Sequence, residues 1–173
     1  AERDTGTREL GRARGHLRFE NVSFRYPNAA SQALSAVTLD VQPGQTVALV
    51  GVSGGGKSTF VNLVTRFYDP EGGRLLLDGV PYPDVKLASL RAQLAMVSQN
   101  VVLFDDTLAA NIAYGAEKID YERLAAAVKA AHLTDVVAKL EDGVETRIGE
   151  NGMRLSGGQR QRVAIARAIY KDA

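Results

Sequence analysis

The residues best suited to chemistry form one run, Gly51-Val52-Ser53-Gly54-Gly55-Gly56-Lys57-Ser58. The run matches the pattern G-x-x-x-x-G-K-[ST], which holds the phosphates of a nucleoside triphosphate. Glycines let backbone N–H groups converge on phosphate oxygens, and Lys57 adds positive charge near the β- and γ-phosphates. The Ser58 hydroxyl is of the type that ligates Mg²⁺ beside them. The alternative is a glycine-rich turn with an incidental Lys-Ser pair, but the pattern favours ATP and Mg²⁺.

Such a loop requires a strand before it and a helix after it. Residues 46–50 form a short, nearly all-apolar run, which predicts a strand buried on both faces. After the loop, Phe60, Leu63, Val64 and Phe67 recur with the spacing of one apolar helix face. The positive end of this helix would point at the phosphate and contribute ~0.3–1 kcal/mol. The loop amides and the lysine charge must therefore supply most of the affinity.

A second glycine motif, Leu155-Ser156-Gly157-Gly158-Gln159, opens a C-terminal helical pattern. Ser156 and Gln159 have the spacing of a capping box, a device that any helix can use. Capping does not explain the two glycines, each of which weakens the first turn by ~1 kcal/mol relative to alanine. Glycines there suit the close approach of a phosphate. Because one chain cannot easily bring two distant helix ends to one γ-phosphate, the pattern indicates two copies, each offering this motif to the other's nucleotide.

The composition excludes several classes of protein. The 173 residues suffice for one domain, and the formal charge of +1 gives no general attraction to nucleic acid. Without cysteine there is no disulfide framework and no thiolate metal site. No stretch approaches the ~20 consecutive apolar residues that cross a bilayer, and no signal-peptide pattern opens the chain. We expect any link to a membrane to come from outside these residues.

The pattern along the chain predicts a strand-rich first half that carries a helical insertion. Residues 1–16 are mostly polar and predict a solvated tail or linker. From Leu17 apolar residues alternate, and a phase slip near Glu20-Asn21 predicts a bulge in one strand or a break between two. Further strands are expected at 37–41, 74–77 and 94–97, with turns at Pro43-Gly44 and Asp78-Gly79. Helices are expected at 108–113, 121–131 and 133–140 and from Ser156, after a loop at 143–152.

Together the two glycine motifs resemble the Walker A loop and the signature of the ABC ATPases, and the similarity runs from about Leu17 to Ala173. It implies an α/β fold: a P-loop NTPase core with an N-terminal antiparallel β subdomain and an inserted α-helical subdomain at about 105–160. Residues 1–16 would be a linker from a transmembrane domain missing from this chain. Residues 17–173 would be an incomplete ATP-binding domain, without the C-terminal part of the core.

The resemblance also implies roles for single residues. Tyr26 is similar to the aromatic that stacks on adenine, although it also fits an apolar face shared with Val22 and Phe24. Gln99 is similar to the glutamine that touches Mg²⁺ and the attacking water. The loop 146–152 resembles one that contacts the membrane domain in exporters. The implied catalytic residues are Lys57 and Gln99, and the implied metal ligands are Ser58 and Gln99. The implied ATP-binding set is Tyr26, Gly51, Val52, Ser53, Gly54, Gly55, Gly56, Lys57, Ser58 and Thr59, with Leu155, Ser156, Gly157, Gly158 and Gln159 acting from the second copy.

Three segments, at 65–69, 87–91 and 111–115, are similar to exporters that flip lipids across the bacterial inner membrane. The resemblance therefore implies ATP-driven export of a lipid-like substrate. Its expected partners are the transmembrane domain and a second ATP-binding domain, and its place is the cytoplasmic face of that membrane. A multidrug or peptide exporter is the alternative. A soluble ABC-type ATPase is disfavoured, because no heptad run separates the two glycine motifs.

The next element of the family is a strand ending in Asp-Glu, where the glutamate polarises the attacking water. The chain stops at 171–173, before it, and neither His16 nor His132 occupies the place of the family's later histidine. We therefore expect the 173-residue chain alone to hydrolyse ATP no faster than background. In a smaller departure, Gly55 stands where the family often has serine or cysteine.

Overall fold

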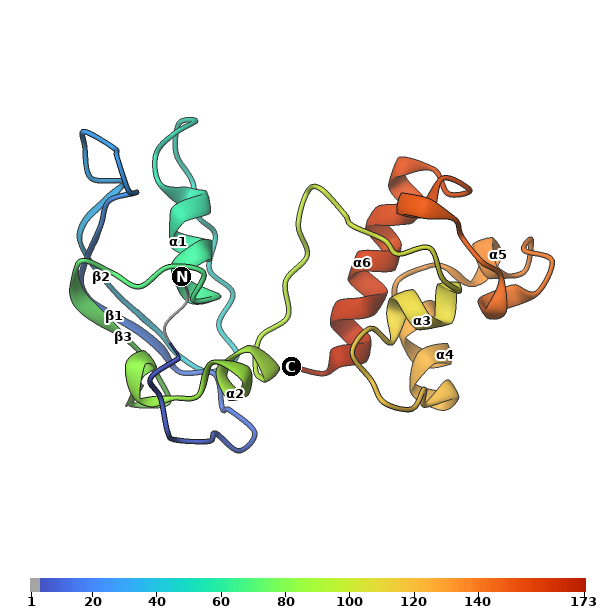
Figure 1. Cartoon of the computed structure of the whole chain (residues 1–173), viewed down its shortest axis with the longest axis horizontal. Helices are drawn as coiled ribbons and strands as arrows, with labels where there is room; N and C mark the ends of the chain where they lie inside the picture. The colour runs from blue at the N-terminus through green and yellow to red at the C-terminus, as the bar shows by residue number, and fades with distance from the viewer. Residues whose placement is uncertain (1–3) are drawn as a thin grey trace. The chain divides into compact units, whose positions relative to one another are not determined.

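The computed structural model describes residues 4–173, with the backbone alone at Asn151. The chain forms two compact units, one ending at Leu94 and the other beginning at Ala95. The first unit holds strands β1 (Leu17–Phe24), β2 (Leu34–Val41), β3 (Gly72–Leu77) and β4 (Val80–Pro81), helices α1 (Lys57–Val64) and α2 (Leu87–Ala92), and the 3₁₀ turn η1 (Tyr82–Asp84). The second holds α3 (Leu108–Ile112), α4 (Tyr121–Ala130), α5 (Thr134–Val137), η2 (Gly143–Glu145), η3 (Glu150–Gly152) and α6 (Gly157–Lys171) (Figure 1).

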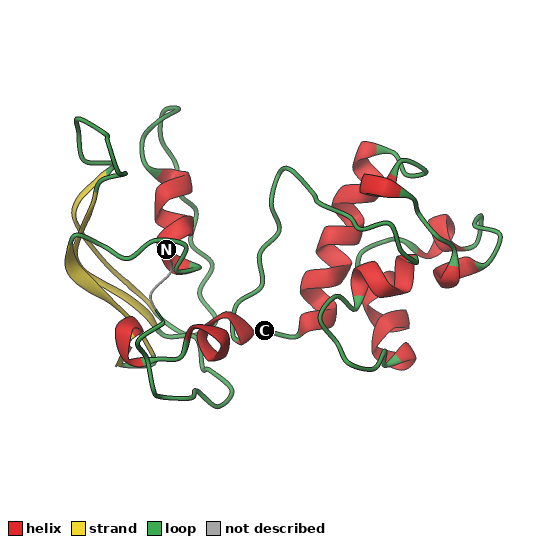
Figure 2. Cartoon of the chain, in the orientation of Figure 1, coloured by secondary structure: helices red, strands yellow, loops and turns green. Residues whose placement is uncertain are grey.

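The first unit is built on an antiparallel sheet with the order β2-β1-β3-β4, and α1 lies against it (Figure 2). The predicted phase slip is a bulge in β1, where the register shifts between Phe19 and Val22 and Asn21 has φ 50°. Both apolar residues are fully buried despite the slip, because the extra residue returns the alternation to the same face. Phe19 also stacks on Phe60 of α1 with centroids 4.3 Å apart, which joins the helix to the sheet.

Two predicted strands do not form. Residues 46–50 and 94–97 are extended or irregular, and no strand in the described part of the chain pairs with either. Val50 is 89% exposed, whereas the sequence predicted a strand buried on both faces. A strand of this kind is stabilised by hydrogen bonds to neighbouring strands along both edges and by elements packed on both faces. Residues 46–50 cannot supply these partners themselves. The apolar pattern identified the type of strand but not the partners that it needs.

Residues 4–16 of the leading segment are mostly exposed but are hydrogen-bonded to the first unit, and their role as a linker stays a prediction. The backbone N–H of Arg8 donates to the carbonyl of Asp84 at 2.9 Å. Two residues on, the N–H of Leu10 donates to the Ser89 hydroxyl at 2.8 Å. Leu10 also packs against the apolar core of the first unit. The segment thus lies along η1 and α2, and several of its backbone donors find acceptors there.

The end of the leader is fixed by Asp78, in the turn after β3. Its carboxylate accepts from the N–H of Arg14 at 2.6 Å and from the N–H of His16 at 2.9 Å. Burial by itself would raise the pKa of Asp78, but these amide hydrogen bonds outweigh it and hold the pKa below its ordinary value. The predicted Asp78-Gly79 turn is confirmed, and its aspartate also anchors the leader.

The second unit is helical, as predicted. Its core gathers apolar residues from α3, α4 and α6 with others from the connecting loops, including Leu108, Ile112, Leu124, Leu133, Ile148, Leu155 and Val163. Thr107 and Asp120 cap α3 and α4 with their side chains, and Ser156 and Gln159 form the predicted capping box of α6. Within residues 4–173, no helix combines the length and apolarity that a membrane span requires.

Candidate nucleotide-binding site

The phosphate loop leads directly into α1. Gly56 is the N-cap of the helix with φ 82°, and its carbonyl accepts the first helical hydrogen bond, from Phe60 N at 2.8 Å. Gly51 and Gly54 also have positive φ, and the space beside each, where a Cβ would stand, is open. The loop is exposed from Gly51 to Gly55. An anion can therefore approach the loop backbone closely, and phosphate binding there stays a prediction.

Lys57 closes the loop on itself. Its Nζ donates to the carbonyls of Gly51 at 2.9 Å and Val52 at 2.7 Å, and both hydrogen bonds are exposed. The ammonium group is thus held over the mouth of the loop by two neutral acceptors. A phosphate is a stronger acceptor for this charge than a carbonyl, so the lysine is placed to exchange these contacts for phosphate oxygens.

Gly56 has no room for a side chain. A Cβ there would lie 2.6 Å from the Ala33 carbonyl oxygen and 2.9 Å from Leu34 Cδ2, and φ 82° is unfavourable for any L-residue. We expect Gly56→Ala to lower the free energy of unfolding by about 2–3 kcal/mol. Gly54→Ala is the matched control, because Gly54 has φ 80° but open space around it. Urea denaturation should show a larger loss for Gly56→Ala, and equal losses would contradict the steric argument.

Gly55, where the family often has a larger residue, differs from these glycines. Its φ is not in the left-handed region, and an added Cβ would lie 3.1 Å from the Val52 carbonyl, a tight contact with a loop that can adjust. Its N–H donates to that same carbonyl at 3.1 Å. The structure therefore accounts for a serine or cysteine being acceptable here.

Tyr26 follows β1 and is half-buried. Its ring meets Phe24 and Tyr68 edge-on, with centroids 4.9 and 5.2 Å away, and its hydroxyl lies 3.2 Å from the Thr59 hydroxyl. The structure thus brings Tyr26 to the helix that begins at the phosphate loop. It also packs Tyr26 beside Phe24, so the stacking role and the apolar role are compatible, and stacking on adenine stays a prediction.

Gln99 is exposed and belongs to the second unit. The neighbouring Ser98 carbonyl accepts from the Gln161 side chain of α6 at 3.4 Å. The Gln99 loop is therefore tied to the helix that the signature opens, and its roles toward Mg²⁺ and water stay predictions. Among the residues that the structure describes, no three His, Cys, Asp or Glu side chains gather as a metal site. An Mg²⁺ ion here would be held mainly by nucleotide phosphates, with Ser58 as a protein ligand.

The signature motif lies at the exposed N-terminus of α6. Ser156 Oγ accepts from Gln159 N at 3.3 Å, and Gln159 Oε1 accepts from Ser156 N at 2.7 Å. A Cβ on Gly158 would meet nothing within 4 Å, and one on Gly157 would meet only the Arg160 guanidinium at 3.9 Å. Neither glycine is required by the packing of its own chain. Because the two glycines lower helix stability without serving the packing of their own chain, they favour a ligand or partner that approaches the helix N-terminus closely.

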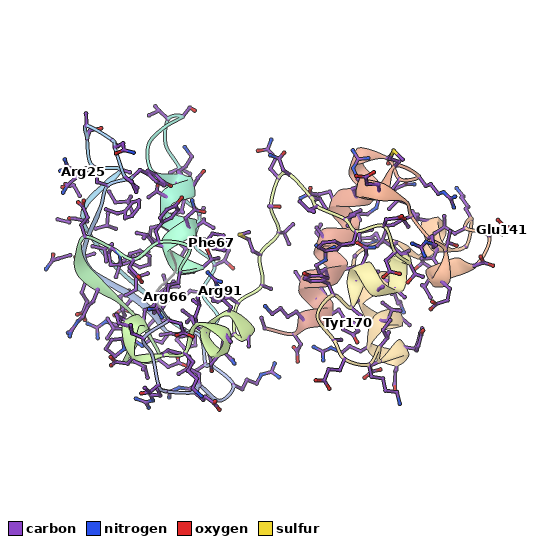
Figure 3. The ribbon with its side chains drawn as sticks, in the orientation of Figure 1. Arg25, Arg66, Phe67, Arg91, Glu141 and Tyr170 are labelled. Atoms are coloured by element: carbon purple, nitrogen blue, oxygen red, sulfur yellow. The ribbon has the colours of Figure 1, made fainter. Side chains whose placement is uncertain are left out.

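A support for α1 at its other end was not predicted from the sequence. Arg66, Phe67 and Arg91 lie close together (Figure 3), and the Arg91 guanidinium donates to the Arg66 carbonyl at 3.0 Å and lies over the Phe67 ring. Arg66 is only 5% exposed and donates to the carbonyls of Tyr82 and Val85. The Tyr82 hydroxyl donates to the carbonyl of Val64, the last residue of α1, at 3.1 Å, and cations near a helix C-terminus complement its dipole. The helix is thus anchored where it ends, and the loop at its start is exposed.

The loop 146–152, predicted to contact a membrane domain, is only partly exposed. Thr146 and Ile148 are buried, whereas Arg147 and Glu150 are exposed. Arg147 donates to the Asp105 carbonyl at 2.9 Å. The exposed positions are therefore available to a partner, and that role stays a prediction.

Comparison with known proteins identifies the family of this chain and its fold. The family model described as "ABC transporter" matches residues 34–173. The chain is 59% identical over 174 residues to the ATP-dependent lipid A-core flippase of Thiobacillus denitrificans, covering 100% of this chain and 30% of that protein. It is 61% identical over 175 residues to the protein of the same name from Cupriavidus metallidurans, covering 99% of this chain and 30% of that protein.

A solved structure of a bacterial Atm1-family ABC exporter with ATP bound is similar in shape, with a TM-score of 0.87 and 45% identity over 94% of this chain and 29% of that one. The predicted ABC ATPase fold, with its antiparallel sheet and helices, is thereby confirmed. The chain spans about 30% of the length of these relatives. With its phosphate loop, its signature helix and this match over most of its length, the chain belongs to the ABC transporter family.

Proposed function

We propose that this chain is the ATP-binding part of an exporter that couples ATP binding and hydrolysis to the movement of a lipid-like substrate across the bacterial inner membrane. The observation that carries the proposal is the exposed glycine loop, closed by Lys57 at the N-terminus of α1. The lipid substrate is supported by relatives of 53–61% identity that are named lipid A-core flippases. The similarity to the Atm1-family exporter is lower, at 45%.

In this proposal two copies of the domain face one another and bind ATP between them. Each copy holds the triphosphate on its own loop, through the amides of residues 51–56 and the Lys57 ammonium group, and Tyr26 supports the adenine. The open N-terminus of α6 from the other copy, with Gly157 and Gly158, completes the site. Mg²⁺ would neutralise charge on the β- and γ-phosphates, with Ser58 and Gln99 as its protein ligands.

Closing and opening of such a pair would drive the transmembrane domain of the same exporter between its two accessible states. The domain would then work at the cytoplasmic face of the membrane. Cargo is selected by the transmembrane domain, so lipid export depends on residues outside this chain. Hydrolysis depends on positioning an in-line water, and residues 1–173 do not include the family's Asp-Glu strand that orients it.

One comparison of steady-state ATP turnover tests the proposal. The full-length protein in proteoliposomes should hydrolyse ATP, and a lipid A-type glycolipid should stimulate it at least about twofold. The polypeptide 1–173 alone should stay at background, because the group that orients the water is not among its residues. Stimulation by drugs or peptides and not by the glycolipid would identify another cargo. Turnover by the polypeptide at the full-length rate would disprove the expected inactivity.

A further inference from the structure

The hydroxyl group of Tyr26 is held by two residues of α1. Asn62 Nδ2 donates to this hydroxyl at 3.2 Å, and the Thr59 hydroxyl lies 3.2 Å from it. Thr59 and Asn62 are three residues apart, so they share one face of the helix. Thr59 is 5% exposed and Asn62 is half-buried, so both contacts are partly removed from water.

The ring of Tyr26 is restrained as well. Its plane stands at 85° to Phe24 and 86° to Tyr68, at centroid separations of 4.9 and 5.2 Å, which are favourable edge-to-face contacts. A tyrosine side chain has only two torsions, and contacts at both the ring and the hydroxyl fix them. Tyr26 is therefore preorganised, so little conformational entropy is lost when a ligand stacks on it.

The anchoring residues belong to the helix that begins at Lys57. A helix is a rigid spacer with a rise of about 1.5 Å per residue, so the anchors stand at a fixed distance from the phosphate loop. We propose that Asn62 is a positioning residue for base recognition: with Thr59, it holds the Tyr26 ring at a set distance from the loop, so that the domain recognises a base and a triphosphate together. This inference rests on the proposed ATP-binding function.

The inference separates two kinds of ligand. A ligand with an adenine base should benefit from the anchored ring, whereas inorganic tripolyphosphate contacts the loop alone. Without a hydrogen bond to its hydroxyl, the Tyr26 side chain must be ordered when the ligand binds, which corresponds to about a 3- to 10-fold loss of affinity. A change that merely loosened α1 would weaken both ligands equally, because both use the N-terminus of this helix.

Isothermal titration of the full-length protein with ATP and with tripolyphosphate tests the inference. Asn62→Ala should weaken ATP binding about 3- to 10-fold, because the released Tyr26 ring must be ordered on binding, and should change tripolyphosphate binding less than about 2-fold. Tyr26→Phe, which keeps the ring and removes the hydroxyl, should give the same pattern. The double variant should lose little more than either single variant, because all three lack the same contact.

Val61→Ala is the matched control, since Val61 is on the same helix and 39% exposed. It should leave both affinities unchanged. Three results would each overturn the inference. Asn62→Ala could weaken the binding of ATP and of tripolyphosphate equally, or it could weaken the binding of neither. The third is that the losses of the two single variants add up in the double variant. Lys57→Ala distinguishes this failure from that of the proposed function: if Lys57→Ala leaves the binding of both ligands intact, the phosphate site itself is wrong.

Discussion

Replacing Lys57 with alanine should weaken ATP binding by the full-length protein about 100-fold, without destabilising the fold. The lysine would make charge-assisted hydrogen bonds to phosphate oxygens, and two such bonds lost together account for a change of this size. In the ligand-free loop its partners are the exposed carbonyls of Gly51 and Val52, which contribute little to stability. Titration calorimetry measures the affinity, and thermal melting without nucleotide measures the fold.

Lys118→Ala is the charge-matched control, because Lys118 is exposed and lies in the second unit. It removes the same charge from the protein but should leave the affinity for ATP unchanged. If Lys57→Ala and Lys118→Ala bind ATP alike, the phosphate loop assignment is wrong. A lower melting temperature for Lys57→Ala alone would mean that the lysine also supports the fold.

Gly158→Ala should lower ATP turnover by the full-length protein about 100-fold while leaving the domain as stable as before, or slightly more so. Within its own chain the added methyl group meets nothing within 4 Å, and alanine favours the helix by up to ~1 kcal/mol. In the proposed pair of domains the methyl group would stand between the α6 N-terminus and the γ-phosphate of the other copy. Turnover and thermal melting, measured on the same preparations, separate these opposite effects.

Gly11→Ala provides the comparison, since a Cβ on Gly11 also meets nothing within 4 Å and Gly11 lies in the leader. It should keep full turnover. Nucleotide affinity adds a second criterion: Gly158→Ala should still bind ATP on its own loop, unlike Lys57→Ala. Normal turnover by Gly158→Ala would show that no phosphate approaches this glycine.

Features that depend on residues close in sequence were predictable. The capping box needs only Ser156 and Gln159 three residues apart, and the bulge at Asn21 follows from a slip in a period of two. The phosphate loop was recognisable because its chemistry fixes glycine, lysine and serine at set spacings. In each case a short segment contains all the groups that make the structure.

Features that join distant residues were not predictable. The strand expected at 46–50 was identified by composition, yet strand formation depends on neighbours that no local pattern reveals. The contacts of Arg66 with Tyr82 and Val85, and that of Asn62 with Tyr26, join polar groups 16 to 36 residues apart. A single arginine or asparagine has the same appearance in sequence whether it faces solvent or anchors a helix. The contacts of the leader were not predictable either, because backbone N–H groups of the leader donate to residues more than 60 positions away.

The binding of the leader along α2 determines how the domain would respond to tension. Its hydrogen bonds to Asp84, Leu87, Ser89 and Asp78 are spread along the segment, from Asp4 to His16. A pull on the N-terminus along the line of the segment would load all these hydrogen bonds at the same time. The segment could then move only if they broke together. A pull away from the surface would break them one at a time, beginning at Asp4, whose carboxylate accepts from the Leu87 N–H. The direction of the force, more than its size, would therefore decide whether α2 moves together with the leader or the leader detaches from α2.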